Sequence, residues 1–217
     1  MSPDGRDPPR GYASPPCYLH EVEEPPSRAE VMRWRKSERE RLIAARLAMP
    51  SRVRRAHSER IARFLEEAIG DLAAVTVSTY APIRGEPGLT TLLDSIVALG
   101  GRHALPVVLE RGKPMVFRAW APGEPLERGI WNIPQPPASA DVVVPNVVIA
   151  PIVGYDAECY RLGYGGGFFD RTLAAMSERP RVFGIGYAEA AIATIHPFPH
   201  DVRMTAIVTE EGVIQTR

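Results

Sequence analysis

Residues 142–176 restrict the possible folds of this chain more than any other segment. Residues 142–152 are almost continuously apolar, which is typical of a β-strand buried on both faces of a sheet. Four glycines then occur within residues 163–167. The residues that follow, 168–176, have the pattern of a helix. A buried strand, a glycine-rich turn and a helix in this order predict an α/β domain.

The glycine-rich turn also has the composition of an anion site. Glycine permits positive φ angles, so such a turn can point successive N–H groups at an anion, and the start of a helix favours negative charge. Arg161 and Arg171 flank the turn, and Asp170 could hold a magnesium ion that bridges phosphates. The glycine spacing matches neither the Walker motif nor the dinucleotide fingerprint. From the residues alone, nucleotide phosphate binding and a purely structural turn both remain open.

Strands and helices alternate along most of the chain. Ser27 and Glu30 form the pattern of a capping box, which predicts that Ser27 caps the first helix. Helices are expected at 27–49, 51–69 and 89–99, and further strands at 73–80, 104–109, 115–118, 182–187 and 204–209. We therefore expect a three-layer α/β fold with a mostly parallel, Rossmann-like sheet, helices on both faces and an N-terminal helical pair. Ligands of such sheets bind beyond the carboxyl ends of the strands, where the glycine-rich turn lies.

Composition limits the class of protein. Residues 1–26 contain seven of the 22 prolines and little that could form a core, so we expect a flexible extension followed by a single domain at 27–217. The formal net charge of zero argues against a nucleic-acid partner. No apolar run suits a membrane span or a secretory signal, and the two cysteines do not suggest a disulfide framework. A cytoplasmic monomer or small homo-oligomer is expected.

Three separate segments resemble a known enzyme family. Residues 153–171, which end in Arg-Leu-Gly-Tyr-Gly-Gly-Gly-Phe-Phe-Asp-Arg, resemble the signature of the 5-formyltetrahydrofolate cyclo-ligases, also called methenyltetrahydrofolate synthetases. Residues 129–136 (Gly-Ile-Trp-Asn-Ile-Pro-Gln-Pro) resemble the folate-side loop of the family, and residues 200–210 resemble its C-terminal block. The similarity extends over about residues 30–215 in consistent order. It implies an ATP- and Mg²⁺-dependent enzyme that closes 5-formyltetrahydrofolate to 5,10-methenyltetrahydrofolate and releases ADP and phosphate.

The resemblance also implies roles for individual residues. Arg39 and Arg161 would act in catalysis, and Asp170 and Asp201 would hold the magnesium ion. The ATP phosphates would be bound by Arg35, Arg39, Arg161, Leu162, Gly163, Tyr164, Gly165, Gly166, Gly167, Phe168 and Phe169. The folate substrate would be bound by Glu86, Trp131, Ile133 and Pro134. Without the resemblance, Arg35 and Arg39 would be interpreted as part of a solvated helix surface. The Trp131 loop would be interpreted as ordinary packing against the core.

The chain departs from the family pattern at three positions. Arg35 stands where the family usually has lysine, Gly88 replaces a second acidic residue that contacts substrate in the family, and Thr205 stands where aspartate is common. The residues expected to bind ATP therefore match the family pattern better than the residues expected to bind folate. Two alternatives to an active cyclo-ligase follow: a paralogue that uses ATP on another folate or heterocycle, and a non-catalytic regulator that binds nucleotide or folate.

Overall fold

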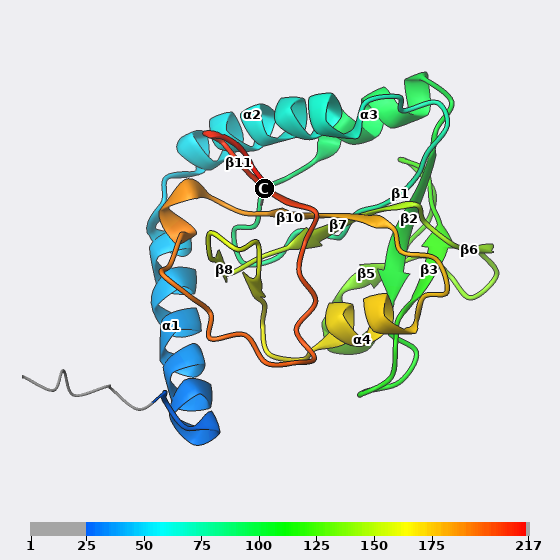
Figure 1. Ribbon diagram of the computed structural model, residues 1–217. Helices are drawn as coiled ribbons and strands as arrows, with labels where there is room; N and C mark the ends of the chain where they lie inside the picture. Colours follow the sequence, from blue (N-terminus) through cyan, green and yellow to red (C-terminus); the bar gives the residue numbers. More distant parts are fainter. Residues whose placement is uncertain (1–24, 216–217) are drawn as a thin grey trace, which may run out of the picture.

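The structure, a computed structural model, describes residues 25–215 and is built on one eight-stranded sheet (Figure 1). Apart from Pro25 and Pro26, the extension expected at residues 1–26 lies outside the described residues. In spatial order the strands are β12 (Gly212–Ile214), β11 (Ala206–Thr209), β10 (Arg181–Ile185), β7 (Val147–Pro151), β1 (Thr76–Ser78), β2 (Arg102–Val107), β3 (Val116–Ala119) and β6 (Val142–Val143).

The sheet is mostly parallel, as predicted. The pairings β11–β10, β10–β7, β7–β1 and β1–β2 are parallel, whereas β12, β3 and β6 add antiparallel edges. In β7, Val147 and Ile149 are buried in one apolar cluster, and Val148 and Ala150 in a second. This alternation confirms that the central strand is buried on both faces.

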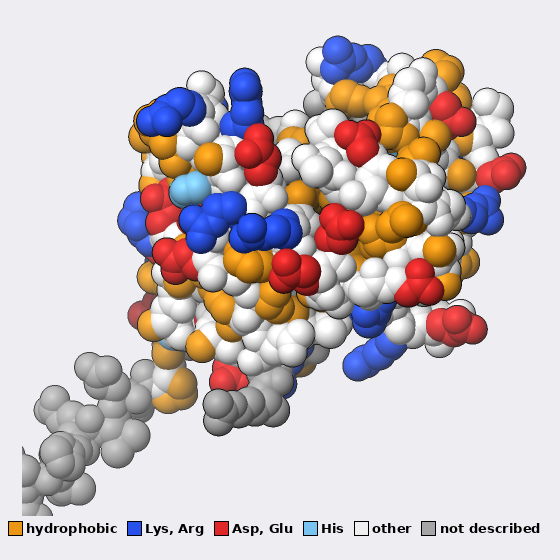
Figure 2. Space-filling model, turned by 90° about the horizontal axis from the view of Figure 1, so that it is seen from above, with side chains coloured by type: hydrophobic (Ala, Val, Ile, Leu, Met, Phe, Trp, Pro, Cys, Tyr) orange, Lys and Arg blue, Asp and Glu red, His pale blue; other side chains and the backbone are white. Residues whose placement is uncertain are grey.

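Helices cover both faces, which completes the predicted three-layer α/β architecture. The helices α2 (Ser51–Ile69) and α3 (Thr90–Ala98) pack on one face, where they contribute Ile61, Leu65 and Leu92 to the first cluster. The helix α4 (Phe168–Ala175) lies below the sheet in Figure 1, and its Leu173 joins the second cluster. On the face formed by α2 and α3, seen in Figure 2, basic and acidic side chains are interspersed.

The first helix, α1 (Arg28–Ala48), runs along one end of the sheet (Figure 1). Its predicted N-cap is confirmed, because Ser27 and Glu30 form both hydrogen bonds of a capping box. The side chains that α1 buries are Val31, Arg35, Leu42 and Arg46. Since these positions are spaced by four, seven and four residues, they lie along one face of the helix. No helix of the described residues is long and apolar enough to span a bilayer.

The apolar run at 142–152 corrects one expectation, because it forms two strands rather than one. Between β6 and β7 lies Pro145, which has no N–H for a strand ladder. Asn146 then accepts a hydrogen bond from the Thr76 N–H through its side chain and donates its own N–H to the Thr76 carbonyl. These bonds start β7 beside β1, while β6 turns to the sheet edge and pairs with β3.

Short elements that the sequence analysis did not predict lie around the sheet. The connection at 121–140 contains a hairpin of β4 (Glu127–Arg128) and β5 (Pro134–Gln135), with a 3-10 turn η1 (Ile130–Asn132) at its tip. A second hairpin of β8 (Gly154–Tyr155) and β9 (Arg161–Leu162) leads from β7 to the glycine-rich turn. The remaining helical turn, η2 (Ala188–Ala190), follows β10.

Candidate active site

The candidate site lies where the order of the parallel strands reverses. From β1 the chain crosses through α3 to β2, whereas from β7 it crosses through α4 on the opposite face to β10. Such a reversal opens a crevice beyond the carboxyl ends of the two central strands. Here β1 is followed by the turn at 83–86 and β7 by Ile152. Both segments are contacted by α1.

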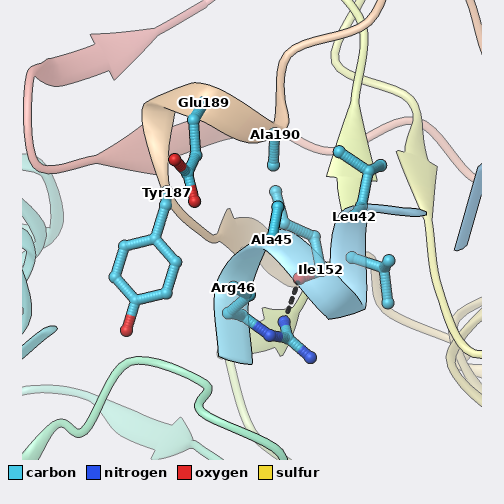
Figure 3. Close-up of a pocket in the computed structure, with 8 residues that line it drawn as sticks. Leu42, Ala45, Arg46, Ile152, Tyr187, Glu189 and Ala190 are labelled. Carbon is cyan, nitrogen blue, oxygen red and sulfur yellow. Dashed lines mark hydrogen bonds between the residues drawn. The ribbon is translucent and has the colours of Figure 1, made fainter. Parts of the chain in front are cut away.

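Arg46 of α1 joins these segments. Its guanidinium donates to the Ile152 carbonyl at 3.1 Å, to the Arg84 carbonyl at 3.0 Å and to the Tyr164 hydroxyl at 2.6 Å. Figure 3 shows the first of these bonds beside a small cavity of about 10 Å³ between α1 and η2. Arg46 is 5% exposed, so it is a buried cation held mainly by neutral acceptors. Arg46 is not among the site residues predicted from the sequence, although its spacing of eleven from Arg35 places it on the same helix face.

The glycine-rich turn is exposed and lies against Arg39. Gly165 and Gly167 have φ angles of +94° and +63°, which glycine adopts without strain. Gly167 occupies the N-cap position of α4. The Arg39 Nε donates to the Gly163 carbonyl at 2.6 Å, and its guanidinium carbon would lie 3.4 Å from a β-carbon at Gly165. Glycines here therefore allow a cation and the loop backbone to approach closely.

Arg39 is a cation beside this loop that has no carboxylate partner among the described residues. It is half-buried, and it forms no ion pair with any carboxylate of residues 25–215. Burial, with the neighbouring charge of Arg35, lowers the pKa of the Arg39 guanidinium. A desolvated cation beside exposed loop amides can bind an anion at this place.

Arg161 and Asp170 form a buried ion pair on the other side of the turn. The Arg161 Nη2 lies 2.9 Å from the Asp170 Oδ1, which also accepts the Val202 N–H at 2.9 Å. Arg161 is 8% exposed and donates further to the Val202 carbonyl. Burial lowers the pKa of the Arg161 guanidinium, and the charge of Asp170 opposes that change.

Asp201 is paired with Arg35 in the same region. The Arg35 Nη2 lies 2.6 Å from the Asp201 Oδ2, and the Phe198 N–H donates to the same oxygen at 2.7 Å. Although burial opposes the effect, the hydrogen bonds from Arg35 and Phe198 hold the pKa of this carboxyl below its usual value. Arg35 also donates to the carbonyls of Ile195 and His196, so α1 is tied to this loop.

The two predicted magnesium ligands line one groove. Its volume is about 920 Å³, and its walls include the three glycines 165–167, Asp170, Arg179, Asp201 and Thr205. Within the described residues no three metal-binding side chains come together. Magnesium, however, is often held by one or two carboxylates together with phosphates and water, and the Asp170 Oδ2 makes no hydrogen bond with the described residues. The donors present therefore fit an ion that is shared with a phosphate group.

Glu86 lies in the turn that follows β1. It is 7% exposed, and its Oε2 accepts the Ile83 N–H at 2.8 Å, whereas its Oε1 is buried without a well-oriented hydrogen bond from the described residues. Burial raises the pKa of the Glu86 carboxyl, and the Ile83 amide, Arg46 and Tyr164 offset this only in part. Burial also raises the pKa of Tyr164 to about 12. A buried carboxyl oxygen in need of a donor can bind an N–H group of a ligand.

Gly88, the position of the missing acid, donates its N–H to the Ser58 hydroxyl at 3.1 Å. No β-carbon contact would arise within 4 Å at Gly88, so space for a larger side chain exists there. At Thr205, the hydroxyl accepts the Val182 N–H at 2.8 Å. Thr205 thus fastens its loop to β10.

Trp131 projects from the tip of the β4–β5 hairpin toward the glycine-rich turn. Its ring contacts that of Phe168 edge-to-face, with a centroid distance of 5.3 Å. It is 52% exposed, whereas Ile133 and Pro134 are partly buried at the base of the hairpin. Phe169 packs at the edge of the second cluster, and Leu162 is fully inside it. The structure thus brings the predicted phosphate loop and the predicted aromatic wall together, while the Leu162 side chain faces the core.

Comparison with known proteins identifies relatives of the whole domain. Residues 31–210 match the profile of the 5-formyltetrahydrofolate cyclo-ligase family. The 5-formyltetrahydrofolate cyclo-ligase of Mycolicibacterium smegmatis is 30% identical over 184 residues, which cover 81% of this chain and 94% of the relative. The enzyme of the same name from Escherichia coli K12 is 27% identical and covers 68% of this chain and 91% of its own length.

Two solved structures share the fold. The 5,10-methenyltetrahydrofolate synthetase of Aquifex aeolicus superposes with a TM-score of 0.73 at 24% identity, covering 84% of this chain and 93% of that protein. The 5,10-methenyltetrahydrofolate synthetase of Mycoplasma pneumoniae gives a TM-score of 0.68 at 18% identity, covering 81% and 98%. These similarities confirm the three-layer α/β fold.

Proposed function

Because this chain belongs to the 5-formyltetrahydrofolate cyclo-ligase family, we propose that it catalyses the ATP- and Mg²⁺-dependent closure of 5-formyltetrahydrofolate to 5,10-methenyltetrahydrofolate, with ADP and phosphate as the other products. The relatives named for this activity span almost the same domain. The observation that carries the proposal is the half-buried Arg39, which has no carboxylate partner among the described residues and lies against the exposed glycine-rich turn.

The proposed reaction has a clear chemical requirement. The oxygen of a formamide is a poor leaving group, so attack of N10 on the formyl carbon cannot expel it. Transfer of the γ-phosphoryl group to that oxygen, with release of ADP, converts it into a phosphate ester. N10 then attacks the formyl carbon and loses its proton, and the C–O bond breaks as phosphate leaves. Phosphoryl transfer needs positioning and charge stabilisation more than an acid–base pair.

The glycine-rich turn would bind the phosphates in this reaction. The backbone amides of residues 163–167 and the Arg39 guanidinium would hold the transferring group, and Phe168 would begin the helix whose N-terminus favours anions. Arg161 is buried behind Asp170, and Arg35 behind Asp201. We therefore infer that these two arginines serve the reaction by orienting the carboxylates.

Asp170 and Asp201 would hold the magnesium ion at the groove. When bound, the ion would neutralise charge on the phosphate oxygens of ATP. The hydrogen bonds from Arg35 and Phe198 hold the pKa of the Asp201 carboxyl below its usual value, which favours the anionic form that a magnesium ion needs. Asp170 forms an ion pair with the buried Arg161.

The folate would lie between Glu86 and the Trp131 hairpin. The buried Oε1 of Glu86 would accept an N–H of the pterin ring. Trp131, Ile133 and Pro134 would contact the aromatic parts of the folate. Tyr164 would lie between the proposed phosphate site and the proposed folate site, because it belongs to the glycine-rich turn and accepts a hydrogen bond from Arg46. This arrangement would bring the formyl oxygen toward the phosphate loop.

A direct assay tests the function and the role of Arg39 together. The purified protein should form methenyltetrahydrofolate from 5-formyltetrahydrofolate only when ATP and Mg²⁺ are present, as followed by near-ultraviolet absorbance. Arg39→Gln should lower kcat/KM for ATP by about 100-fold, because it removes a charge from the phosphate loop. The control Arg41→Gln changes an exposed arginine of the same helix that pairs with Glu38, and it should leave kcat/KM unchanged.

The outcomes separate the alternatives. ATP hydrolysis that is stimulated by another heterocycle, but not by 5-formyltetrahydrofolate, would favour a paralogue. Nucleotide or folate binding without any turnover would favour a regulator. Equal effects of Arg39→Gln and Arg41→Gln would show that the phosphate group binds elsewhere.

A further inference from the structure

The tip of the β4–β5 hairpin exposes an aromatic ring in an unfavourable backbone conformation. Trp131 and Asn132 have φ angles of +59° and +60°, although neither is glycine. The loop is closed by its own backbone, since the Gly129 N–H donates to the Ile133 carbonyl at 2.9 Å and the Asn132 N–H to the Gly129 carbonyl at 3.1 Å. This closure holds the Trp131 side chain outward instead of burying it. Such strain, combined with an exposed tryptophan, points to a binding role.

The ring contacts both the start of α4 and a basic turn. It meets Phe168, the first residue of α4, edge-to-face at 5.3 Å between centroids. The Arg111 guanidinium lies over the Trp131 ring, 5.5 Å from its centroid. Arg111 belongs to the turn between β2 and β3, which descends beside α4 in Figure 1 and is fastened there by a hydrogen bond from the Met115 N–H to the Thr172 hydroxyl at 2.8 Å. Trp131 therefore contacts both Arg111 and Phe168, which follows directly after the glycine-rich turn.

The positive charge of this basic turn has no carboxylate partner among the described residues. Neither Arg111 nor Lys113, two residues further along the turn, forms an ion pair with a carboxylate of residues 25–215. Both side chains are exposed, and Arg111 rests on the Trp131 ring. An arginine held over an aromatic face keeps its N–H groups available for a carboxylate, and its orientation is restricted before the ligand arrives.

We propose that Arg111 binds the carboxylates of the glutamate moiety of the folate substrate, while Trp131 contacts the aminobenzoyl ring between this end and the reacting formyl group. The proposal rests on the proposed function, because it takes the substrate from there. A folate has its reacting formamide at one end and its carboxylates at the other, joined by an aromatic ring. The phosphate loop, the Trp131 ring that contacts Phe168 beside it, and the Arg111 guanidinium on that ring match these three parts in chemistry. Arg111 is thus a specificity-determining residue for substrates that carry a glutamate.

A substitution at Arg111, combined with a substrate that lacks the glutamate, tests the proposal. The probes are 5-formyltetrahydrofolate and 5-formyltetrahydropteroate, which lacks the glutamate. Arg111→Gln should raise KM for the folate by about three- to tenfold with little change in kcat, whereas KM for the pteroate should not change. Arg111→Lys should retain part of the preference, because it keeps the charge but not the planar fork. Arg63→Gln is the matched control: Arg63 is also exposed and lies 5.1 Å from the ring of Phe64, but on α2.

Calorimetric titration of both compounds without ATP provides a second measurement that does not need turnover. Wild-type protein should bind the folate more tightly than the pteroate, and Arg111→Gln should reduce that difference. If the folate binds with this preference but is not converted, the proposed function fails and the carboxylate site stands. An equal loss of affinity for both compounds, no loss for either, or no binding to the wild type would each overturn the assignment of Arg111.

Discussion

Asp170 shows how one side chain can serve both stability and chemistry. Its Oδ1 is fully used by Arg161 and the Val202 amide, so the carboxylate neutralises a buried cation and fastens the groove wall. From the sequence, Asp170 was expected only as a metal ligand. The structure adds a cost, because a buried arginine would lose its anionic partner.

Asp170→Asn should therefore affect both properties. We expect the free energy of unfolding to fall by about 1–3 kcal/mol, since asparagine can still accept a hydrogen bond but leaves Arg161 without a counter-charge. The Mg²⁺ concentration that supports half-maximal turnover should rise by at least about tenfold. Urea unfolding and Mg²⁺ titration of the rate measure the two effects separately.

The control is Glu158→Gln, which removes an exposed ion pair with Arg203. It should change the unfolding free energy by less than about 0.5 kcal/mol and leave the Mg²⁺ dependence as in the wild type. An Asp170→Asn protein that is destabilised, yet turns over with normal Mg²⁺ dependence, would show that Asp170 is structural only.

At the scale of elements, a buried histidine joins the neighbouring strands β1 and β2 to a loop. The Thr79 hydroxyl, just after β1, lies 2.7 Å from the Nε2 of His103 in β2, and the His103 Nδ1 lies 2.9 Å from the Trp120 carbonyl. Because the carbonyl can only accept, Nδ1 carries the proton and Nε2 accepts from Thr79. Burial lowers the pKa of His103 from 6.5 to about 4, and the bond to Trp120 opposes this only in part.

This pKa predicts the direction of a pH effect on stability. Between pH 6.5 and 4 the unfolded chain binds a proton at His103 that the folded protein does not, so stability falls as the pH falls through this window. The stability advantage of the wild type over His103→Gln should be about 2 kcal/mol smaller at pH 5 than at pH 8. Urea titrations at both pH values test this. A difference for His103→Gln that stays constant between the two pH values would refute the buried neutral form.

The elements that the sequence predicted are those with strong local signals. Ser27 and Glu30 determine where α1 begins, because each satisfies a backbone group of the other. The division of residues 142–152 into β6 and β7 depends instead on whether Asn146 meets Thr76, a contact distant in sequence. The short edge strand β12 is stabilised by its pairing with β11. The pattern of its three residues alone is too short to predict a strand.

At the scale of the molecule, the site is assembled from segments far apart in the chain, and α1 connects them. The residues themselves indicated the glycine-rich turn, and the resemblance added Arg35 and Arg39, but the contacts of Arg46 with Ile152 and Arg84 require the folded sheet. The attachment of α1 is unusual, since its arginines donate to loop carbonyls while only Val31 and Leu42 of its apolar side chains are buried. By contrast, α2 buries Ile61, Ala62, Leu65 and Ile69 in the core.

This difference predicts that α1 opens more easily than α2. Helices with few buried apolar contacts open locally at a lower free energy than helices anchored in the core. Amide hydrogen exchange followed by mass spectrometry should therefore show faster exchange in the C-terminal half of α1 than in the middle of α2 when no ligand is present.

Binding of ATP and Mg²⁺ should then protect α1 and residues 163–167 together, because an anion between Arg39 and the loop amides binds only the docked helix. Arg39→Gln should abolish the protection of both segments at ATP concentrations that protect the wild type, while Arg41→Gln should retain it. Protection of residues 163–167 without any change in α1 would mean that the helix is already fixed and that its arginines do not couple it to the nucleotide. Joint protection would instead show that α1 and the glycine-rich turn act as one cooperative unit. Nucleotide binding would then also hold Arg46 and Tyr164 in place beside the proposed folate site.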